Sequence, residues 1–359
     1  MTDVVVVGGG AMGSAAAWQL ARRGLDVVLL EQFEAGHVRG ASHGASRIFR
    51  LSYPDSVYIG LAREAQTRWR ELEDVTDTQL LTVTGGVDHG DHPHLHLLAD
   101  GLAANGVRRD WLTPAEAAER WPGIRFDTRA LFHPDSGRLH ADHAVAALQQ
   151  AAAKEGAVVR HSTPVTSIEV RGEDSVVVHT DSGSYPARRV VAAVNAWASK
   201  LVGDLVPLPP LRVTQEQPAH FAPLLPEDGW PSFGHIFASA DGIYGLATPG
   251  EGIKVGFHGI GPEVDPDHRD FTPEPNQLAA LRDYARTWLP GVDADDFTPI
   301  SCTYTTTPDS NFVLDRLGPV VVATGFSGHG FKFVPAIGRV LADLAVDGTR
   351  PDPRFTFAR

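Results

Sequence analysis

Short apolar runs and helix-like segments alternate at the start of the chain. Residues 4–7 are all valine, as expected for a parallel strand buried on both faces. The Ala- and Leu-containing stretch 14–23 predicts a helix that Gly24 ends, and the apolar run 27–30 predicts a second buried strand. This order predicts a β-α-β unit at the N-terminus.

Glycines fill the turn of this unit, in the sequence Gly8-Gly-Gly10-Ala11-Met12-Gly13. We expect Gly8 to permit a tight turn, Gly10 to let a pyrophosphate approach the backbone, and Gly13 to let the helix pack closely on the strand. The unpaired N–H groups at the helix N-terminus favour an anion there. The strand, the glycines and the helix together predict a dinucleotide-binding site.

An acidic residue stands at the tip of the second predicted strand. Glu31 follows the glycines by roughly twenty residues, the position from which a carboxylate accepts hydrogen bonds from ribose hydroxyls. A glycine-rich turn that binds nothing is the alternative interpretation. The ordered sequence of strand, glycines, helix, strand and acid favours the dinucleotide site.

The rest of the chain does not repeat this unit. Strands are predicted at 174–179, 189–194 and 320–323, and helices at 142–155 and 334–347. We therefore expect an α/β protein in which a Rossmann-type domain is assembled from segments far apart in the sequence, next to a sheet-containing α+β domain.

Two Pro-rich regions of mixed pattern separate the segments of the Rossmann-type domain. The predicted cofactor domain comprises 1–84, 141–211 and 301–359, and the predicted substrate domain comprises 85–140 and 212–300.

The overall composition excludes several classes of partner. The 359 residues have a net charge of −13, which argues against nucleic acid and against anionic membrane surfaces. No apolar run is long enough to span a bilayer, and the N-terminus enters an apolar strand without the basic segment of a signal peptide. We expect a cytoplasmic protein.

Cys302 is the only cysteine of the chain, so it cannot form an internal disulfide. Three interpretations remain open from the residue alone. A lone cysteine can be a small core residue, a reactive thiol, or a thioether tether to a flavin.

The segment 88–96, Asp-His-Gly-Asp-His-Pro-His-Leu-His, resembles a metal site in composition. It contains four histidines and two aspartates. No matching set of ligands occurs elsewhere in the sequence, and Gly90 with Pro93 predicts a surface turn. We therefore predict no physiological metal.

Three further segments narrow the class of dinucleotide-binding protein. They are 41–50 (Ala-Ser-His-Gly-Ala-Ser-Arg-Ile-Phe-Arg), 302–305 (Cys-Thr-Tyr-Thr) and 325–333 (Gly-Phe-Ser-Gly-His-Gly-Phe-Lys-Phe). Together with the N-terminal glycines, they resemble the monomeric sarcosine oxidase and N-methyltryptophan oxidase family. These enzymes belong to the D-amino-acid-oxidase-like flavoproteins, and the resemblance covers nearly the whole chain.

The resemblance implies a covalent FAD. It assigns Cys302 as the attachment point of the 8α-methyl group and places His43 and Arg47 close to the isoalloxazine ring. The other residues that it places against the cofactor are Gly8, Gly10, Ala11, Met12, Gly13, Glu31, Gln32, Ser42, Val165, Gly325, Ser327, Gly328, His329, Gly330 and Lys332.

The same resemblance implies a substrate site. Arg50 and Lys332 would hold a substrate carboxylate, since Arg supplies a planar two-donor fork and Lys a point charge. Tyr244 and His258 would line the substrate cavity, and Lys254 would assist the reduction of dioxygen near flavin N5. We predict Lys254, His258, Tyr244, Arg47 and His43 as the catalytic residues.

Several of these residues have simpler interpretations. Lys254 alternates with Ile253 and Val255, so by pattern alone it is a strand lysine that could equally face solvent. Arg47 and Arg50 are three residues apart, which also fits one face of an ordinary basic helix. The loop 235–241 does not match the family closely, although it helps to shape the pocket.

The sequence therefore predicts an FAD-dependent oxidase of secondary amines, acting on N-methyl amino acids with dioxygen as electron acceptor. The products would be an imine, which hydrolyses to formaldehyde and a primary amino acid, and hydrogen peroxide. Cyclic imino acids and glycated amino acids are alternative substrates. A dehydrogenase using another acceptor and a non-catalytic dinucleotide-binding protein are the alternative classes. The family resemblance suggests a monomer.

Overall fold

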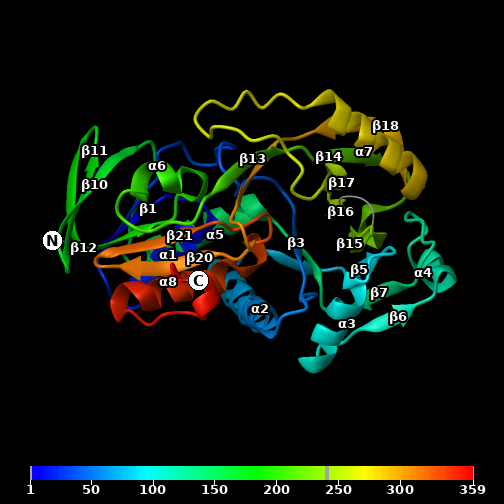
Figure 1. Ribbon diagram of the computed structural model, residues 1–359, viewed down its shortest axis with the longest axis horizontal. Coiled ribbons are helices and arrows are strands. Elements are labelled where there is room, and N and C mark those ends of the chain that lie inside the picture. The colour runs from blue at the N-terminus through cyan, green and yellow to red at the C-terminus, as the bar shows by residue number, and fades with distance from the viewer. Residues whose placement is uncertain (1, 239–241, 359) are drawn as a thin grey trace.

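The computed structural model describes residues 2–238 and 242–358 (Figure 1). One eight-stranded sheet occupies the left half of the view, in the order β10-β11-β12-β1-β2-β9 with β21 beside β12 and β20 beside β21. Its strands are β1 (Thr2–Val7), β2 (Val27–Leu30), β9 (Val158–Arg160), β10 (Val165–Gly172), β11 (Ser175–Thr180), β12 (Gly183–Ala192), β20 (Val313–Leu317) and β21 (Val320–Thr324).

The valine run forms the centre of this sheet. β1 pairs in parallel with both β2 and β12, so its side chains are buried on both faces. Val4 and Val6 contact the core beneath the helices, whereas Val5 and Val7 contact a second apolar cluster on the opposite face.

Four helices cover the first of these faces: α1 (Ala11–Ala21), α2 (Ser56–Thr76), α5 (Ala141–Lys154) and α8 (Val334–Val346). α1 and α8 approach closely because Gly338 has no side chain. A Cβ atom at Gly338 would lie 2.7 Å from atoms of Ala15. The short α6 (Ala198–Val202) packs on the other face.

A second eight-stranded sheet lies in the right half of Figure 1, in the order β18-β14-β17-β16-β15-β5-β7-β6. Its strands are β5 (Gly86–His89), β6 (Asp110–Leu112), β7 (Ala130–His133), β14 (Ala219–Pro223), β15 (Ser232–His235), β16 (Ile243–Thr248), β17 (Gly252–Phe257) and β18 (Val292–Pro299). The helix α7 (Pro275–Trp288) packs on it, and α3 (His94–Ala104) and α4 (Pro114–Arg120) lie at its far end.

Two small sheets lie between the large ones. β3 (Arg47–Phe49), β8 (Gly137–Leu139) and β4 (Leu81–Val83) form the first, and β13 (Arg212–Glu216) pairs with β19 (Cys302–Thr306) in the second. Arg47 and Cys302, which the sequence places close to a flavin ring, therefore start strands at the centre of the molecule.

The predicted α/β fold class is confirmed, and each predicted strand and helix has a counterpart within a few residues, although β12 begins six residues early. The first helix begins at Ala11 rather than Ser14, because Gly10 is already its extended N-cap residue. Two interpretations of local pattern are wrong. Arg47 lies on a strand and Arg50 just beyond it, not on a helix, and Asp88 and His89 lie on a buried strand, not in a surface turn.

The predicted division into two domains stays a prediction. The pocket loop 235–241 falls partly on residues 239–241, outside the described part of the chain. Among the described residues, no helix has the length and apolarity needed to cross a membrane.

Candidate active site

The glycine turn has the geometry that a dinucleotide requires. Gly8 has a φ of +99°, which favours glycine. A Cβ atom at Gly13 would lie 1.9 Å from the carbonyl oxygen of Gly8, so only glycine lets α1 start this close to β1. Ser42 Oγ accepts a hydrogen bond from the N–H of Ala11 at 3.0 Å, which places a polar side chain at the helix N-terminus. The turn can hold a pyrophosphate.

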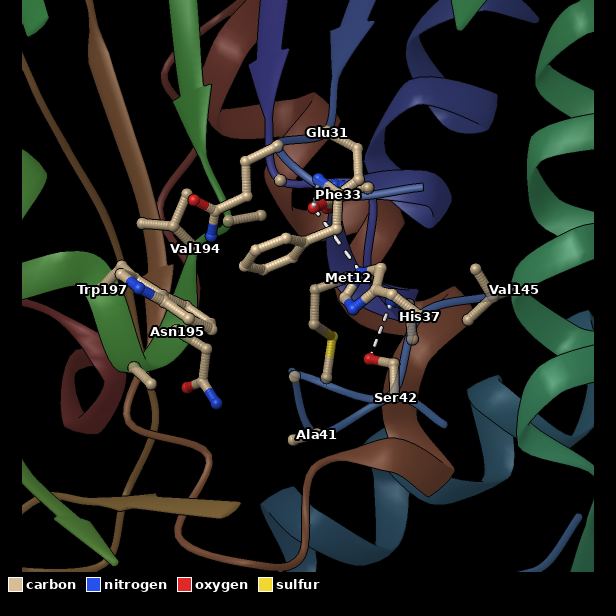
Figure 2. Close-up of a pocket in the computed structure, with 18 of the residues that line it drawn as sticks. Met12, Glu31, Phe33, His37, Ala41, Ser42, Val145, Val194, Asn195 and Trp197 are labelled. Carbon is tan, nitrogen blue, oxygen red and sulfur yellow. Dashed lines mark hydrogen bonds and ion pairs between the residues drawn. The ribbon is translucent and has the colours of Figure 1, made fainter. Parts of the chain in front are cut away.

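A cavity of about 500 Å³ opens from this turn and continues to the centre of the molecule. In Figure 2 the labelled side chains surround an open space, with Glu31 and Phe33 above it, Trp197 to one side, and Met12 and Ser42 below. The predicted cofactor residues that line it are Gly8, Gly10, Ala11, Met12, Glu31, Gln32, Ser42, Arg47, Val165, Cys302, Ser327, Gly328 and Gly330.

Five predicted cofactor residues do not line this cavity. Gly13 and Gly325 shape the backbone, since a Cβ atom at Gly325 would lie 2.5 Å from the Thr307 methyl group. His43 lines a neighbouring cavity. The ring of His329 contacts Tyr53 Oη at 3.2 Å and the Ser310 carbonyl oxygen at 3.1 Å, and its predicted place against the cofactor stays a prediction.

Lys332 is the fifth, and its ammonium group is hydrogen-bonded to Tyr53, as described below.

Glu31 borders the cavity at its glycine end. Its carboxylate accepts hydrogen bonds from the N–H of Gly9 at 2.6 Å and of Phe33 at 3.0 Å, and it is 5% exposed. These bonds fix the carboxylate at the end of β2, next to the turn. Its predicted role on ribose stays a prediction, and the position fits a dinucleotide.

Cys302 and Arg47 meet at the inner end of the cavity. Arg47 Nη2 lies 3.9 Å from Cys302 Sγ. The same guanidinium donates to the carbonyl oxygens of Ala41, His43 and Ser46, at 2.6 to 3.0 Å, so it holds the loop before β3 in place. Cys302 is a free, half-buried thiol at the boundary of two cavities.

The second cavity, of about 270 Å³, lies beyond Cys302 and contains Lys254. Lys254 is 5% exposed, and burial together with the Arg47 charge lowers its pKa to about 7. His43 lines the same cavity, and burial, followed by Arg47, lowers its pKa to about 4. The solvent-facing interpretation of Lys254 is therefore wrong, because its ammonium group is enclosed.

Arg50 and Lys332 both contact Tyr53. Lys332 Nζ donates to Tyr53 Oη at 3.1 Å and to the His329 carbonyl oxygen at 2.7 Å. The Arg50 guanidinium lies 5.5 Å from the Tyr53 ring centroid. Burial, followed by the charge of Arg50, lowers the pKa of Lys332 well below its ordinary value. A carboxylate placed between the two cations would relieve this repulsion.

Tyr304 connects the other predicted pocket residues. It is hydrogen-bonded to Tyr244, and its hydroxyl lies 3.4 Å from His258 Nδ1. Gly328 lets the loop pack against the Tyr304 ring, since a Cβ atom there would lie 2.2 Å from Tyr304 Cε2. Burial, followed by the charges of Arg50 and Lys332, lowers the pKa of His258 to about 4, so its ring is neutral at pH 7.

Sequence reasoning missed several residues of the site. Tyr304 belongs to the recognised Cys-Thr-Tyr-Thr segment, yet only its cysteine was assigned a role. Phe33 and Trp197 line the cofactor cavity with their rings 5.9 Å apart, and no motif marks either of them. Tyr53 also lies outside the recognised segments, three residues after Arg50. Within the described residues, no group of three or more His, Cys, Asp or Glu side chains is arranged to hold a metal ion.

Comparison with known proteins gives a consistent class. Residues 3–344 match the family described as FAD dependent oxidoreductase. Monomeric sarcosine oxidase of Streptomyces avermitilis is 36% identical over 98% of this chain and 95% of its own, and N-methyl-L-tryptophan oxidase of Citrobacter koseri is 29% identical over 96% and 94%. The solved open form of NikD, described as an unusual amino acid oxidase essential for nikkomycin biosynthesis, superimposes with a TM-score of 0.88 at 30% identity, covering 99% of this chain and 97% of NikD.

The fold and the cavity thus define an FAD-dependent oxidoreductase, and the glycine turn, the helix N-terminus and the 500 Å³ cavity fit that cofactor. Within this class, the chain belongs to the family of the monomeric sarcosine oxidases and N-methyltryptophan oxidases, as the three sequence segments predict.

Proposed function

We propose that the chain is an FAD-dependent oxidase of secondary amines that bear a carboxylate, with N-methyl amino acids as substrates. One observation supports this most strongly. Two cationic side chains, Arg50 and Lys332, both contact Tyr53, and a separate buried lysine, Lys254, lines the small cavity that shares Cys302 with the large one. An amine oxidase needs both a site for the amino acid and a site for dioxygen.

Bound FAD would supply the two-electron acceptor for the C–H bond next to the amine nitrogen, and would return the electrons to dioxygen. The chain would hold its pyrophosphate at the Gly8–Gly13 turn and its ring system between Cys302 and the 325–330 loop. Cys302 Sγ would form a thioether bond to the flavin, and its position in the cavity lining supports this role. The adjacent guanidinium of Arg47 would stabilise negative charge on the ring.

The substrate residues would act by orientation. Arg50 and Lys332 would fix the carboxylate, and their shared contact with Tyr53 would help to hold both cations in position. His258 and Tyr244 would enclose the amine without adding charge, since burial lowers the pKa of His258 to about 4 and raises the pKa of Tyr244 well above its ordinary value. Orientation of this kind contributes several kcal/mol to a reaction barrier, roughly 7 or more in the best intramolecular cases.

Lys254 favours dioxygen over another electron carrier. An ammonium group enclosed in a small cavity stabilises the anion that forms when dioxygen takes its first electron. A dehydrogenase has no use for such a group. The same observation disfavours a protein that binds the cofactor without catalysis, because a buried lysine is costly to maintain.

The carboxylate clamp supports amino acids as a class but does not distinguish N-methyl amino acids from cyclic imino acids or glycated amino acids. The similarity to sarcosine oxidases and N-methyl-L-tryptophan oxidase supports the first group. We also propose a cytoplasmic monomer, because bacterial relatives are monomeric sarcosine oxidases and a free Cys302 fits a reducing compartment.

The test is a screen of amines for release of hydrogen peroxide by the purified holoenzyme. The panel pairs each N-methyl amino acid with its primary amino acid and with its decarboxylated amine. We expect peroxide and formaldehyde only with the N-methyl amino acids. Activity with the decarboxylated amines at equal efficiency would contradict the clamp, and electron transfer to a dye without peroxide would replace the oxidase by a dehydrogenase.

The tether is tested separately by acid precipitation. We expect yellow colour in the pellet of the wild type and none in that of Cys302→Ala, whose flavin stays in the supernatant. A colourless wild-type pellet under a yellow supernatant would show that the flavin is bound noncovalently and that Cys302 is only a packing residue.

A further inference from the structure

A buried carboxylate, Asp88, lies behind Arg50. Its Oδ1 is 3.5 Å from Arg50 Nη1. Its Oδ2 accepts hydrogen bonds from Ser52 Oγ at 2.6 Å and from His133 Nε2 at 2.9 Å. Asp88 is 2% exposed, so its carboxylate is shielded from solvent and held by these three groups. Asp88 is not among the predicted site residues, although it contacts one of them, Arg50.

Strand register directs Asp88 toward Arg50. On β5, Val87 belongs to the apolar core beside α7, and His89 stacks on His235 at 3.9 Å. Asp88 alternates with them and points to the other face. Its register partner on β15 is Gly234, where a Cβ atom would lie 2.4 Å from Asp88 Oδ1. The glycine thus leaves the space in which the carboxylate reaches Arg50.

Asp88 is ionised at neutral pH. Burial alone would raise its pKa, but the hydrogen bond and charge of His133 and the charge of Arg50 outweigh burial and lower the pKa to about 2. Because the carboxylate only accepts, His133 donates from Nε2, and its Nδ1 lies 2.6 Å from the Ser136 hydroxyl oxygen. His133, itself hydrogen-bonded to Ser136, therefore holds the Asp88 carboxylate in place.

The charges around the substrate carboxylate can therefore be counted. Arg50 and Lys332 are the two cationic groups, and the rings of His258 and His329 are neutral, since burial is the main cause that lowers their pKa values to about 4 and about 3. Asp88 is the anion in contact with one of the cations. With both cations protonated, the clamp has a net charge of one.

We propose that Asp88 is a specificity-determining residue, which positions Arg50 and offsets one of the two cationic charges, so that the site accepts amines with one carboxylate and disfavours amines with two. The second carboxylate of a dicarboxylic substrate would lose its hydration, and no cation without an anionic partner would remain to bind it. This inference rests on the proposed function, because it requires Arg50 and Lys332 to bind the substrate carboxylate.

The experiment measures the binding of two three-carbon acids, propanoate and malonate, to the holoenzyme by isothermal titration calorimetry at pH 7. Wild type is compared with Asp88→Asn and with Asp100→Asn, which removes the same charge from an exposed position on α3. The quantity of interest is the ratio of the malonate Kd to the propanoate Kd. We expect Asp88→Asn to lower this ratio at least tenfold and Asp100→Asn to leave it unchanged.

A second variant covers the case in which Asp88→Asn does not fold. Gly234→Ala adds a methyl group that must displace the Asp88 carboxylate, so it should lower the ratio in the same direction by a smaller factor. An unchanged ratio in a variant that folds overturns the inference, even if both acids bind more weakly, because equal weakening shows only structural support. Wild type that binds neither acid would instead contradict the clamp of the proposed function, and this inference with it.

Discussion

Replacing Lys254 by methionine should separate the two halves of the proposed reaction. The substitution preserves the length and apolar stem of the side chain and removes its ammonium group. A unit charge about 4 Å from a developing anion contributes roughly 4 kcal/mol at an effective dielectric constant of about 20. We therefore expect the oxygen reaction of the reduced enzyme to slow by roughly 100- to 1,000-fold, the range found when one fixed donor to an anion is removed.

The pH dependence gives the sign of the effect. Burial and Arg47 lower the pKa of Lys254 to about 7, so the charged form is lost as the pH rises through about 7. In wild type the oxygen reaction should be fast below pH 7 and fall above it, whereas in Lys254→Met it should be slow and independent of this ionisation.

Lys254→Met should slow the oxygen reaction but stabilise the folded protein. A lysine whose pKa falls from 10.5 to about 7 on folding destabilises the folded state by up to roughly 5 kcal/mol below pH 7, and this cost disappears as the pH rises toward 10.5. Lys254→Met should therefore raise the free energy of unfolding near pH 7, and the gain over wild type should shrink in alkaline solution.

The assay is stopped-flow absorbance in two separate experiments. The first mixes oxidised enzyme anaerobically with the amine, and the second mixes reduced enzyme with oxygenated buffer. Lys154→Met, the same substitution at an exposed lysine, serves as the matched control. Equal slowing of both half-reactions by Lys254→Met, or a wild-type oxygen rate that rises through pH 7, would refute this role for Lys254.

Two further predictions concern packing and the clamp. Gly13→Ala brings a Cβ atom to 1.9 Å from the Gly8 carbonyl oxygen, so the purified variant should have lost its flavin absorbance, whereas Gly172→Ala, with no atom within 4 Å of its Cβ, should retain it. A Gly13→Ala protein with full flavin content would contradict the turn. Tyr53→Phe removes the hydroxyl that accepts from Lys332 Nζ, so KM should rise about tenfold with little change in kcat, given roughly 1.5 to 3 kcal/mol for a hydrogen bond to a charged group. Tyr185→Phe on β12 is its control, and a Tyr53→Phe variant with unchanged KM would show that the hydroxyl does not support the clamp.

Local pattern was sufficient for the N-terminal half of the cofactor site. The valine run, the glycine turn and Glu31 are contiguous, and their geometry follows from backbone conformation and helix packing within about thirty residues. Gly8 has the positive φ and Gly13 the close packing that the pattern predicts. Both features depend on residues that are close in the sequence, so the local pattern is enough to predict them.

The inner part of the site depends on contacts between distant segments. Lys254, Cys302 and Arg47 line one cavity although their strands, β17, β19 and β3, belong to three different sheets. No local pattern indicates which face of each strand turns inward. Only the family resemblance brought these residues together in advance. It gave no position for Phe33, Trp197 or Tyr53, which have no shared motif.

Asp88 shows how a local interpretation fails. Its segment has the glycine, the proline and the polar residues of a surface turn, and this composition predicts exposure. Pairing of β5 with β7 and β15 buries it instead, and the cost of burying the carboxylate is offset by His133, Ser52 and Arg50. Such compensation becomes visible only when the partners are known.

Anaerobic titration of the purified holoenzyme with an N-methyl amino acid tests the proposed function most directly. We predict that the flavin absorbance bleaches in proportion to the amine added, and that admitting oxygen restores it with one equivalent of hydrogen peroxide. Absorbance that persists through a panel of N-methyl, cyclic and glycated amino acids would contradict the assignment as an amine oxidase.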